Sequence, residues 1–163
     1  MKHLNRRQFL KTGQYGLGAA ALAGLLSQCQ SSRPEPGMRF GLVTYLWAKD
    51  WDLPTLISNC EKTGVLGVEL RTRHAHGVSA QMSKAERTDV KARFADSPVT
   101  LVGMGENWAY HYPDQGRLQQ EIEGTKASIV LSHDIGGSGV KVKPNDLPDD
   151  VPAEQTIAQI ADS

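Results

Sequence analysis

Ionisable side chains gather in a short loop that follows an apolar, strand-like run. Glu69 lies near the end of that run, and His74 and His76 follow it in the loop. Carboxylates and imidazoles transfer protons near neutral pH, and an extended His-x-His pair occurs in zinc and iron sites. We expect Glu69 to face a cavity and both histidines to contact a substrate. A structural ion pair of Glu69 with Arg71 or Arg73, a metal site at the histidines and an ordinary loop are the alternatives.

Two later strand ends carry groups of the same kind. Glu106 and His111 follow a predicted strand at 99–104, and the neighbouring Gly105 leaves room for a ligand or for a close backbone approach. Lys143 ends a further predicted strand, where a lysine reaches an anionic or hydroxylated substrate unless the strand is a solvated edge. The sequence therefore predicts a substrate-binding set with no assigned catalytic residue: Glu69, His74, His76, Glu106, His111 and Lys143.

Four strand-like runs alternate with four helical patterns along the chain. Strands are expected at 40–47, 65–70, 99–104 and 140–143. Helices are expected to begin after Asp52, Ser83 and Asp114, and at Pro152. This alternation predicts an α/β fold whose parallel strands are joined by right-handed helical crossovers. A flavodoxin-like open sheet and the first half of a (β/α)8 barrel both match the order.

The composition fits an ordinary globular domain. The chain has 163 residues, of which 39% are hydrophobic and 22% charged, and its formal net charge is +0. The first 29 residues hold four basic side chains and no acidic one, which leaves 14 basic against 18 acidic residues in the rest, a net charge of −4. This mild acidity argues against nucleic acid as a partner. No later segment approaches the roughly 18 apolar residues that span a bilayer.

The N-terminal segment 1–29 is predicted to be a targeting signal rather than part of the fold. Residues 5–11 resemble a twin-arginine export signal, and a weakly apolar run at 15–26 follows. Cys29 then stands in a pattern similar to a bacterial lipoprotein cleavage box, so the one membrane contact that we expect is a lipid anchor there. Residues 30–37 have the composition of a linker. We expect export by the twin-arginine route, to a periplasmic or lipid-anchored location.

The folded part, residues 38–163, resembles the N-terminal half of a sugar phosphate isomerase/epimerase in the xylose-isomerase-like TIM-barrel group. The resemblance rests on Gly67–Arg71, Thr72–Gly77 and Gly136–Asn145, and the export signal also fits members of this group. It covers about four of the eight βα units of such a barrel, which usually needs about 250 residues. We therefore expect the first four units of a (β/α)8 TIM barrel, truncated before the second half.

The resemblance implies metal-assisted proton transfer next to the carbonyl of a small carbohydrate. A divalent ion, Mn, Zn, Mg or Co, polarises the sugar oxygens, and carboxylates move the proton through an enediolate. In this family the metal ligands lie mainly on strands five to eight, beyond the end of this sequence. The resemblance thus assigns no metal ligand and no catalytic base here, and we expect the chain to lack turnover alone.

Two other functions fit the same residues. A non-catalytic half-barrel would expose a strand edge at each end and a large apolar face, so it would associate with a second copy or with a separate C-terminal half. A metal-dependent endonuclease of the abasic-site branch shares the barrel, but the export signal and the acidic charge disfavour it.

Overall fold

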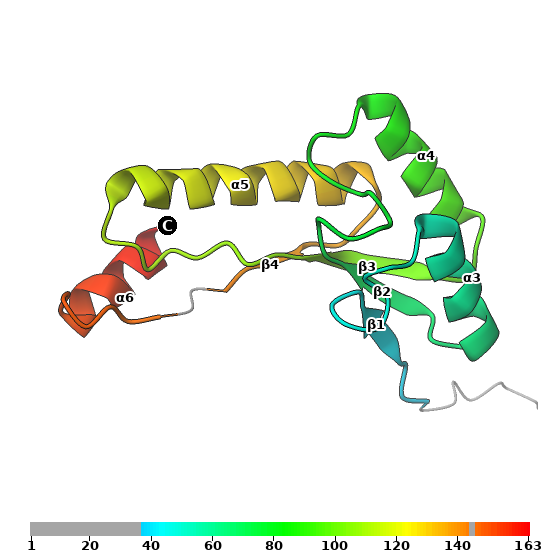
Figure 1. Cartoon of the computed structure of the whole chain (residues 1–163), viewed down its shortest axis with the longest axis horizontal. Coiled ribbons are helices and arrows are strands. Elements are labelled where there is room, and N and C mark those ends of the chain that lie inside the picture. The colour runs from blue at the N-terminus through cyan, green and yellow to red at the C-terminus, as the bar shows by residue number, and fades with distance from the viewer. Residues whose placement is uncertain (1–36, 144–145) are drawn as a thin grey trace, which may run out of the picture. The chain divides into compact units, whose positions relative to one another are not determined.

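The computed structural model describes residues 37–143 and 146–163. The predicted export segment 1–29, with Cys29, lies outside the described residues, as do residues 30–36 of the linker and residues 144–145. Strands and helices alternate through the described chain (Figure 1). The strands are β1 (Gly41–Val43), β2 (Gly67–Leu70), β3 (Thr100–Gly105) and β4 (Val140–Lys141). The helices are α3 (Leu53–Thr63), α4 (Lys84–Ala95), α5 (Gln115–Asp134) and α6 (Ala153–Asp162).

The strands form a parallel sheet in the order β1-β2-β3-β4. Leu42 pairs with Val68 between β1 and β2, and Met104 pairs with Val140 between β3 and β4. The predicted α/β fold with parallel strands is therefore confirmed. Each strand lies beside the next one in the sequence, whereas a flavodoxin-like sheet has the order 2-1-3-4-5. The flavodoxin-like alternative is thus wrong for these four strands.

The helix starts agree with the predicted capping residues. The side chains of Asp52 and Asp114 accept backbone N–H groups in the first turns of α3 and α5. Ser83 and Glu86 form a reciprocal capping box at the start of α4. Gly64 ends α3 with φ of 71°, a left-handed conformation that favours glycine. Among the described residues, no helix is both long enough and apolar enough to cross a bilayer.

The first strand is shorter than the sequence predicts. β1 stops at Val43 rather than running to residue 47. Thr44 still donates its backbone N–H to the Glu69 carbonyl at 3.1 Å. Its hydroxyl then accepts the Arg71 backbone N–H at 3.0 Å, so a side-chain contact replaces the strand ladder. The chain turns away after that point, which places the end of β1 beside the loop that follows β2.

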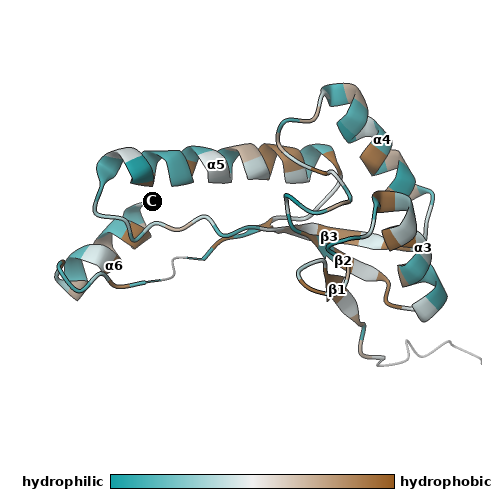
Figure 2. Ribbon diagram, viewed as in Figure 1, coloured by the Kyte–Doolittle hydropathy of each residue, from teal (hydrophilic) through white to brown (hydrophobic). Residues whose placement is uncertain are grey.

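The core lies between one face of the sheet and helices α3, α4 and α5. Val68 and Leu70 lie two residues apart on β2, so their side chains share this face, and both are fully buried. They belong to one continuous cluster with Leu56 of α3, Phe94 of α4 and Leu131 of α5. Figure 2 shows the corresponding pattern on α3 and α4, whose hydrophobic and hydrophilic residues lie on different sides. The three helices therefore pack on the same face of the sheet.

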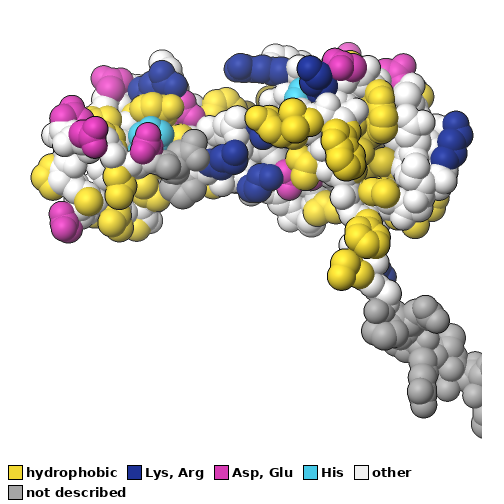
Figure 3. Space-filling view, turned by 60° about the horizontal axis from the view of Figure 1, so that its bottom comes forward, with side chains coloured by type: hydrophobic (Ala, Val, Ile, Leu, Met, Phe, Trp, Pro, Cys, Tyr) yellow, Lys and Arg dark blue, Asp and Glu magenta, His cyan; other side chains and the backbone are white. Residues whose placement is uncertain are grey.

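The opposite face of the sheet is only partly covered. Val43 is 38% exposed and Val102 is 48% exposed. Glu69 and Lys141 form an ion pair on this face. Figure 3 shows hydrophobic side chains at the surface, interspersed with Lys and Arg. Within the described residues, the sheet thus has one face packed against helices and one that remains accessible.

Candidate functional site at the carboxyl ends of β2 and β3

A cavity of about 250 Å³ opens beyond the carboxyl ends of β2 and β3. The loop after β2 contributes Arg71–Arg73 to its walls, and the loop after β3 contributes Glu106–Trp108. Tyr112, Arg117 and Glu121 complete the lining from the start of α5 and the loop before it. Carboxyl ends of parallel strands are the usual location of ligand sites in α/β folds.

Glu106 is the buried carboxylate of this cavity. The residue is only 6% exposed, and its Oε2 accepts a hydrogen bond from the Thr72 hydroxyl at 3.0 Å. Its Oε1 is buried and has no hydrogen-bond partner among the described residues. Burial raises the pKa of the Glu106 carboxyl, while the Thr72 hydrogen bond and the guanidiniums of Arg71 and Arg73 lower it in part. A buried polar atom without a partner costs about 1–3 kcal/mol, so this oxygen is well suited to meet a ligand group.

Two guanidiniums lie beside this carboxylate. The Arg71 guanidinium stacks over the Tyr45 ring, 4.8 Å from its centroid. Neither Arg71 nor Arg73 forms an ion pair with any described residue, although the sequence offered both as partners for Glu69. Arg73 has φ of 67°, a left-handed conformation that is rare and costly for a residue with a side chain. The loop thus holds two positive charges at the cavity, near the Glu106 carboxyl but in no ion pair with a described residue.

The loop after β3 is fastened along α5. The Trp108 indole Nε1–H donates to the Ser128 hydroxyl at 2.9 Å, and the Tyr110 and Thr125 hydroxyls lie 2.6 Å apart. Gly124 makes this approach possible, because a Cβ there would lie 2.5 Å from the Trp108 ring. The indole that walls the cavity is therefore fixed by a glycine and a serine one helical turn apart.

The start of α5 closes the cavity with a neutralised charge pair. The Arg117 guanidinium lies 4.1 Å from the Tyr112 ring centroid, and its Nε is 3.5 Å from the Glu121 carboxylate. Glu121 also accepts the Ala109 backbone N–H at 3.1 Å. Gln159 of α6 donates to the Tyr112 carbonyl at 3.0 Å, which fastens the loop from the other side. Arg117 and Glu121 thus largely satisfy each other, unlike the arginines after β2.

Glu69 lies on the accessible face of the sheet and is not one of the residues that line this cavity. Its carboxylate pairs with Lys141 of β4. The side chain crosses β3 at Gly105, where a Cβ would lie 2.9 Å from the Glu69 carboxyl carbon. The predicted room at Gly105 is therefore filled by Glu69 rather than left open.

His74 and His76 lie together but make different contacts. Their ring centroids are 5.9 Å apart. His76 accepts the Val78 backbone N–H at Nδ1, 3.0 Å away, and its Nε2 lies 2.8 Å from the Arg71 carbonyl, so Nε2 carries the proton and donates. Burial lowers the pKa of His76 to about 4. His74 Nδ1 lies 3.1 Å from the Thr44 hydroxyl. Both nitrogens of His76 hold the loop in shape, which leaves neither for a ligand in this arrangement.

His111 and Lys143 are not among the residues that line the cavity. The His111 ring packs beside Tyr112, with 4.3 Å between ring centroids. Lys143 donates its backbone N–H to the Trp108 carbonyl at 3.0 Å, and its side chain is exposed. β4 itself ends at Lys141 rather than at residue 143. Of the six predicted binding residues, Glu106 is thus the one that the structure places in the cavity wall.

The residues present do not fit the divalent ion that the family resemblance implies. Across residues 37–143 and 146–163, no group of three or more His, Cys, Asp or Glu side chains could hold a metal ion. Glu69 is paired with Lys141, and the nitrogens of His76 are used by the backbone. This part of the chain therefore does not supply the ligand set that the implied metal-assisted reaction needs.

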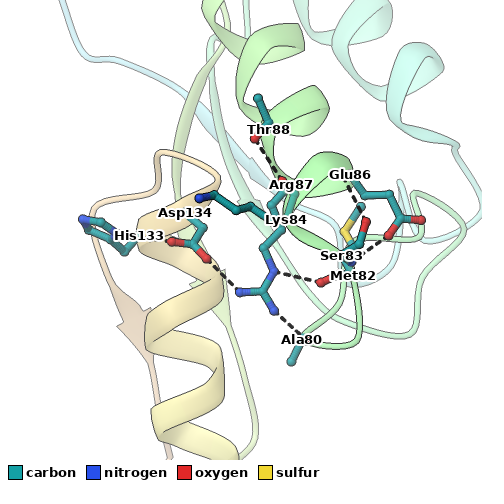
Figure 4. Close-up of polar contacts among 9 residues, drawn as sticks. All are labelled: Ala80, Met82, Ser83, Lys84, Glu86, Arg87, Thr88, His133 and Asp134. Atoms are coloured by element: carbon teal, nitrogen blue, oxygen red, sulfur yellow. Dashed lines mark hydrogen bonds and ion pairs between the residues drawn. The ribbon is translucent and has the colours of Figure 1, made fainter.

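A second cavity, of about 320 Å³, lies between α4 and the end of α5. Figure 4 shows the hydrogen bonds of the Arg87 guanidinium beside this cavity. It donates to the Met82 and Ala80 carbonyls at 3.1 and 2.7 Å, and to the Asp134 carboxylate at 2.8 Å. Each nitrogen of this guanidinium has a protein acceptor. We interpret Arg87 as a structural tie between the two helices.

The chain matches no family model, and the comparisons with curated proteins and with solved structures found no match.

Proposed function

We propose that this chain binds a small carbohydrate in the cavity at the carboxyl ends of β2 and β3, as the N-terminal half of a sugar (phosphate) isomerase/epimerase-like barrel. The observation that carries the proposal is Glu106, a buried carboxylate whose Oε1 has no hydrogen-bond partner among the described residues. Carbohydrate hydroxyls donate hydrogen bonds, and a carboxylate oxygen without a partner is an acceptor for one of them.

The sheet order supports the half-barrel interpretation. Sequential parallel strands with all core helices on one face correspond to consecutive units of a (β/α)8 barrel. In such a barrel the accessible face of the sheet, with Glu69 and Lys141, would line the interior. The cavity beside Glu106 would then lie at the catalytic end of the barrel.

Binding and turnover are separate parts of this proposal. The family's chemistry uses a divalent ion, and the described residues do not supply its ligands. We therefore propose that this chain contributes ligand recognition and that isomerisation needs residues it does not contain. Assays with Mn, Zn, Mg or Co and a panel of ketoses and aldoses are expected to show no turnover by the chain alone.

Isothermal titration calorimetry with a panel of aldoses and ketoses tests the binding proposal. Glu106→Gln is expected to weaken carbohydrate binding at least about tenfold, the effect of one lost hydrogen bond of about 1.4 kcal/mol. Glutamine has nearly the same shape as glutamate. The Thr72 hydroxyl needs an acceptor, so the amide oxygen takes the place of Oε2. The amide NH₂, which cannot accept a hydrogen bond, then takes the place of Oε1. Glu61→Gln, at an exposed site on α3, serves as the matched control. Absence of binding by the unmodified chain, or equal binding by the Glu106→Gln variant, would contradict the proposal.

The accessible face of the sheet favours a second candidate function, association with another copy of this chain. β1 and β4 are the edges of the described sheet. Two copies related by a two-fold axis would place β4 of each beside β1 of the other, which covers Val43 and Val102 and leaves no open edge. Light scattering after size exclusion is expected to give a dimer that Val102→Glu dissociates. Ile129→Glu, at an exposed site on α5, is the control, and a monomer at every concentration would refute the association.

We also propose that the chain is exported by the twin-arginine route and is periplasmic or anchored at Cys29. The support is the sequence of residues 5–11, with Arg6 and Arg7 adjacent. Replacing both arginines with lysine is expected to keep the protein in the cytoplasm on cell fractionation. Unchanged export of that double variant would contradict the assignment.

A further inference from the structure

The charges around the cavity are not balanced. Arg117 is neutralised by Glu121, whereas Arg71 and Arg73 form no ion pair within residues 37–143 and 146–163. Glu106 is the remaining charged group in the lining, and burial raises the pKa of its carboxyl, which favours the neutral form. The cavity therefore carries at least one net positive charge, and two when Glu106 is protonated.

The loop after β2 is built to hold the two arginines in place. The Arg71 backbone is fixed at both ends: its N–H donates to the Thr44 hydroxyl at 3.0 Å, and its carbonyl accepts from His76. Its guanidinium rests on the Tyr45 ring. Arg73 keeps a left-handed backbone that the surrounding loop must impose. These contacts reduce the freedom that the arginines would lose on binding a ligand.

Resting on the proposed function, we infer that the carbohydrate bound here carries an oxyanion, a carboxylate or a phosphate, which the guanidiniums of Arg71 and Arg73 bind while a ligand hydroxyl meets Glu106 Oε1. Guanidinium groups match both oxyanions with paired N–H donors. The cavity of about 250 Å³ leaves room for a small ligand of this kind. Neutral sugars then bind through the Glu106 side alone and more weakly.

Calorimetric titration of the full chain with D-glucose, D-gluconate, D-glucose 6-phosphate and inorganic phosphate tests this inference. One of the two anionic sugars is expected to bind at least about tenfold more tightly than glucose, since a hydrogen bond to an ionised group is roughly twice as strong as a neutral one. The better of the two identifies the oxyanion. Arg71→Gln and Arg73→Gln are each expected to weaken binding of that anionic sugar more than binding of glucose, so that most of the advantage is lost.

Arg93→Gln is the matched control, because Arg93 is an exposed arginine paired with Asp89 on α4. Glucose binding equal to that of both anionic sugars would overturn the oxyanion assignment and leave the proposed function intact. Inorganic phosphate binding as tightly as glucose 6-phosphate would show a bare anion site and would also overturn it. Absence of binding by every sugar would count against the proposed function itself. An unchanged anion preference in both arginine variants would show that other groups bind the anion.

Discussion

Glu106 and His76 show how burial gives two ionisable residues different tasks. Glu106 makes one hydrogen bond, to Thr72, and keeps the other oxygen without a partner in the described chain. His76 uses both ring nitrogens on backbone groups of its own loop. Burial disfavours the charged form of each side chain, which raises the pKa of the carboxyl and lowers that of the imidazole. The carboxyl is free to meet a ligand, and the imidazole shapes the loop that carries the arginines.

The lowered pKa of His76 predicts a stability change in acid. Unfolded His76 takes up a proton as the pH falls below about 6.5, whereas folded His76 resists protonation until about pH 4. The free energy of unfolding should therefore decrease as the pH falls from about 6.5 to about 4. Urea unfolding at several pH values in this window should show a smaller decrease for His76→Gln than for the unmodified chain. His133→Gln, whose side chain is 89% exposed, should keep the full decrease; a His76→Gln curve parallel to the original would contradict the assignment.

At the scale of elements, α5 serves as the support for the loop that walls the cavity. Trp108 lies over Gly124 and donates to Ser128, and Tyr110 contacts Thr125. These contacts run along one side of the helix, so the loop is held along its length rather than at one point. In the interior of a helix, glycine is less favourable than alanine, so α5 by itself would be more stable with alanine at position 124. The sequence keeps glycine there because the indole needs the space.

Gly124→Ala tests this role. Alanine favours helices by about 1 kcal/mol over glycine, but a Cβ 2.5 Å from the Trp108 ring must displace the indole. Overpacking of this kind costs about 1–3 kcal/mol, which equals or exceeds the gain from alanine. We therefore expect Gly124→Ala to leave the free energy of unfolding unchanged or to lower it, and to change the fluorescence of Trp108. Gly116→Ala in the same helix is the control, because its Cβ would meet only Asp114 Oδ1, at 3.4 Å. Stabilisation by Gly124→Ala with unchanged fluorescence would contradict the role.

Local signals in the sequence predict the order of the elements and the helix starts, but neither the ends of β1 and β4 nor the contacts between elements. Asp52, Ser83 and Asp114 each mark a helix start, because capping depends on residues in the same turn. The alternative ion-pair partners that the sequence suggests for Glu69 are its neighbours Arg71 and Arg73, whereas the structure pairs Glu69 with Lys141. That pair depends on the register of three strands, which no local pattern encodes.

The sequence predicts only part of the site, because the site also depends on contacts between distant residues. Glu106 was recognised from its position after a strand, and the structure places it in a cavity wall. The lining role of Thr72 and of the two arginines was missed, although two basic residues directly after a strand end are a signal that could have indicated it. The hydrogen bonds of His76 to its own loop could not be predicted, because a His-x-His spacing does not show where the backbone turns.

At the scale of the whole molecule, the described sheet has four parallel strands in sequential order and helices that share one face. Such a sheet is compatible with half of a (β/α)8 barrel, in which a ligand site would lie at the carboxyl ends of the strands. The cavity beside Glu106 occupies that end, whereas the cavity beside Arg87 lies between two helices. The proposed function therefore depends on the first cavity alone.

Mapping of ligand contacts by ¹H–¹⁵N NMR tests that dependence most directly. During titration with the tightest-binding carbohydrate, we predict shift changes at the backbone amides of Thr72 and Asn107 and at the Trp108 indole N–H. The amides of Arg87 and Thr88, beside the other cavity, should not change. Shift changes confined to Arg87 and Thr88, or a spectrum unaffected by every carbohydrate tested, would contradict the account.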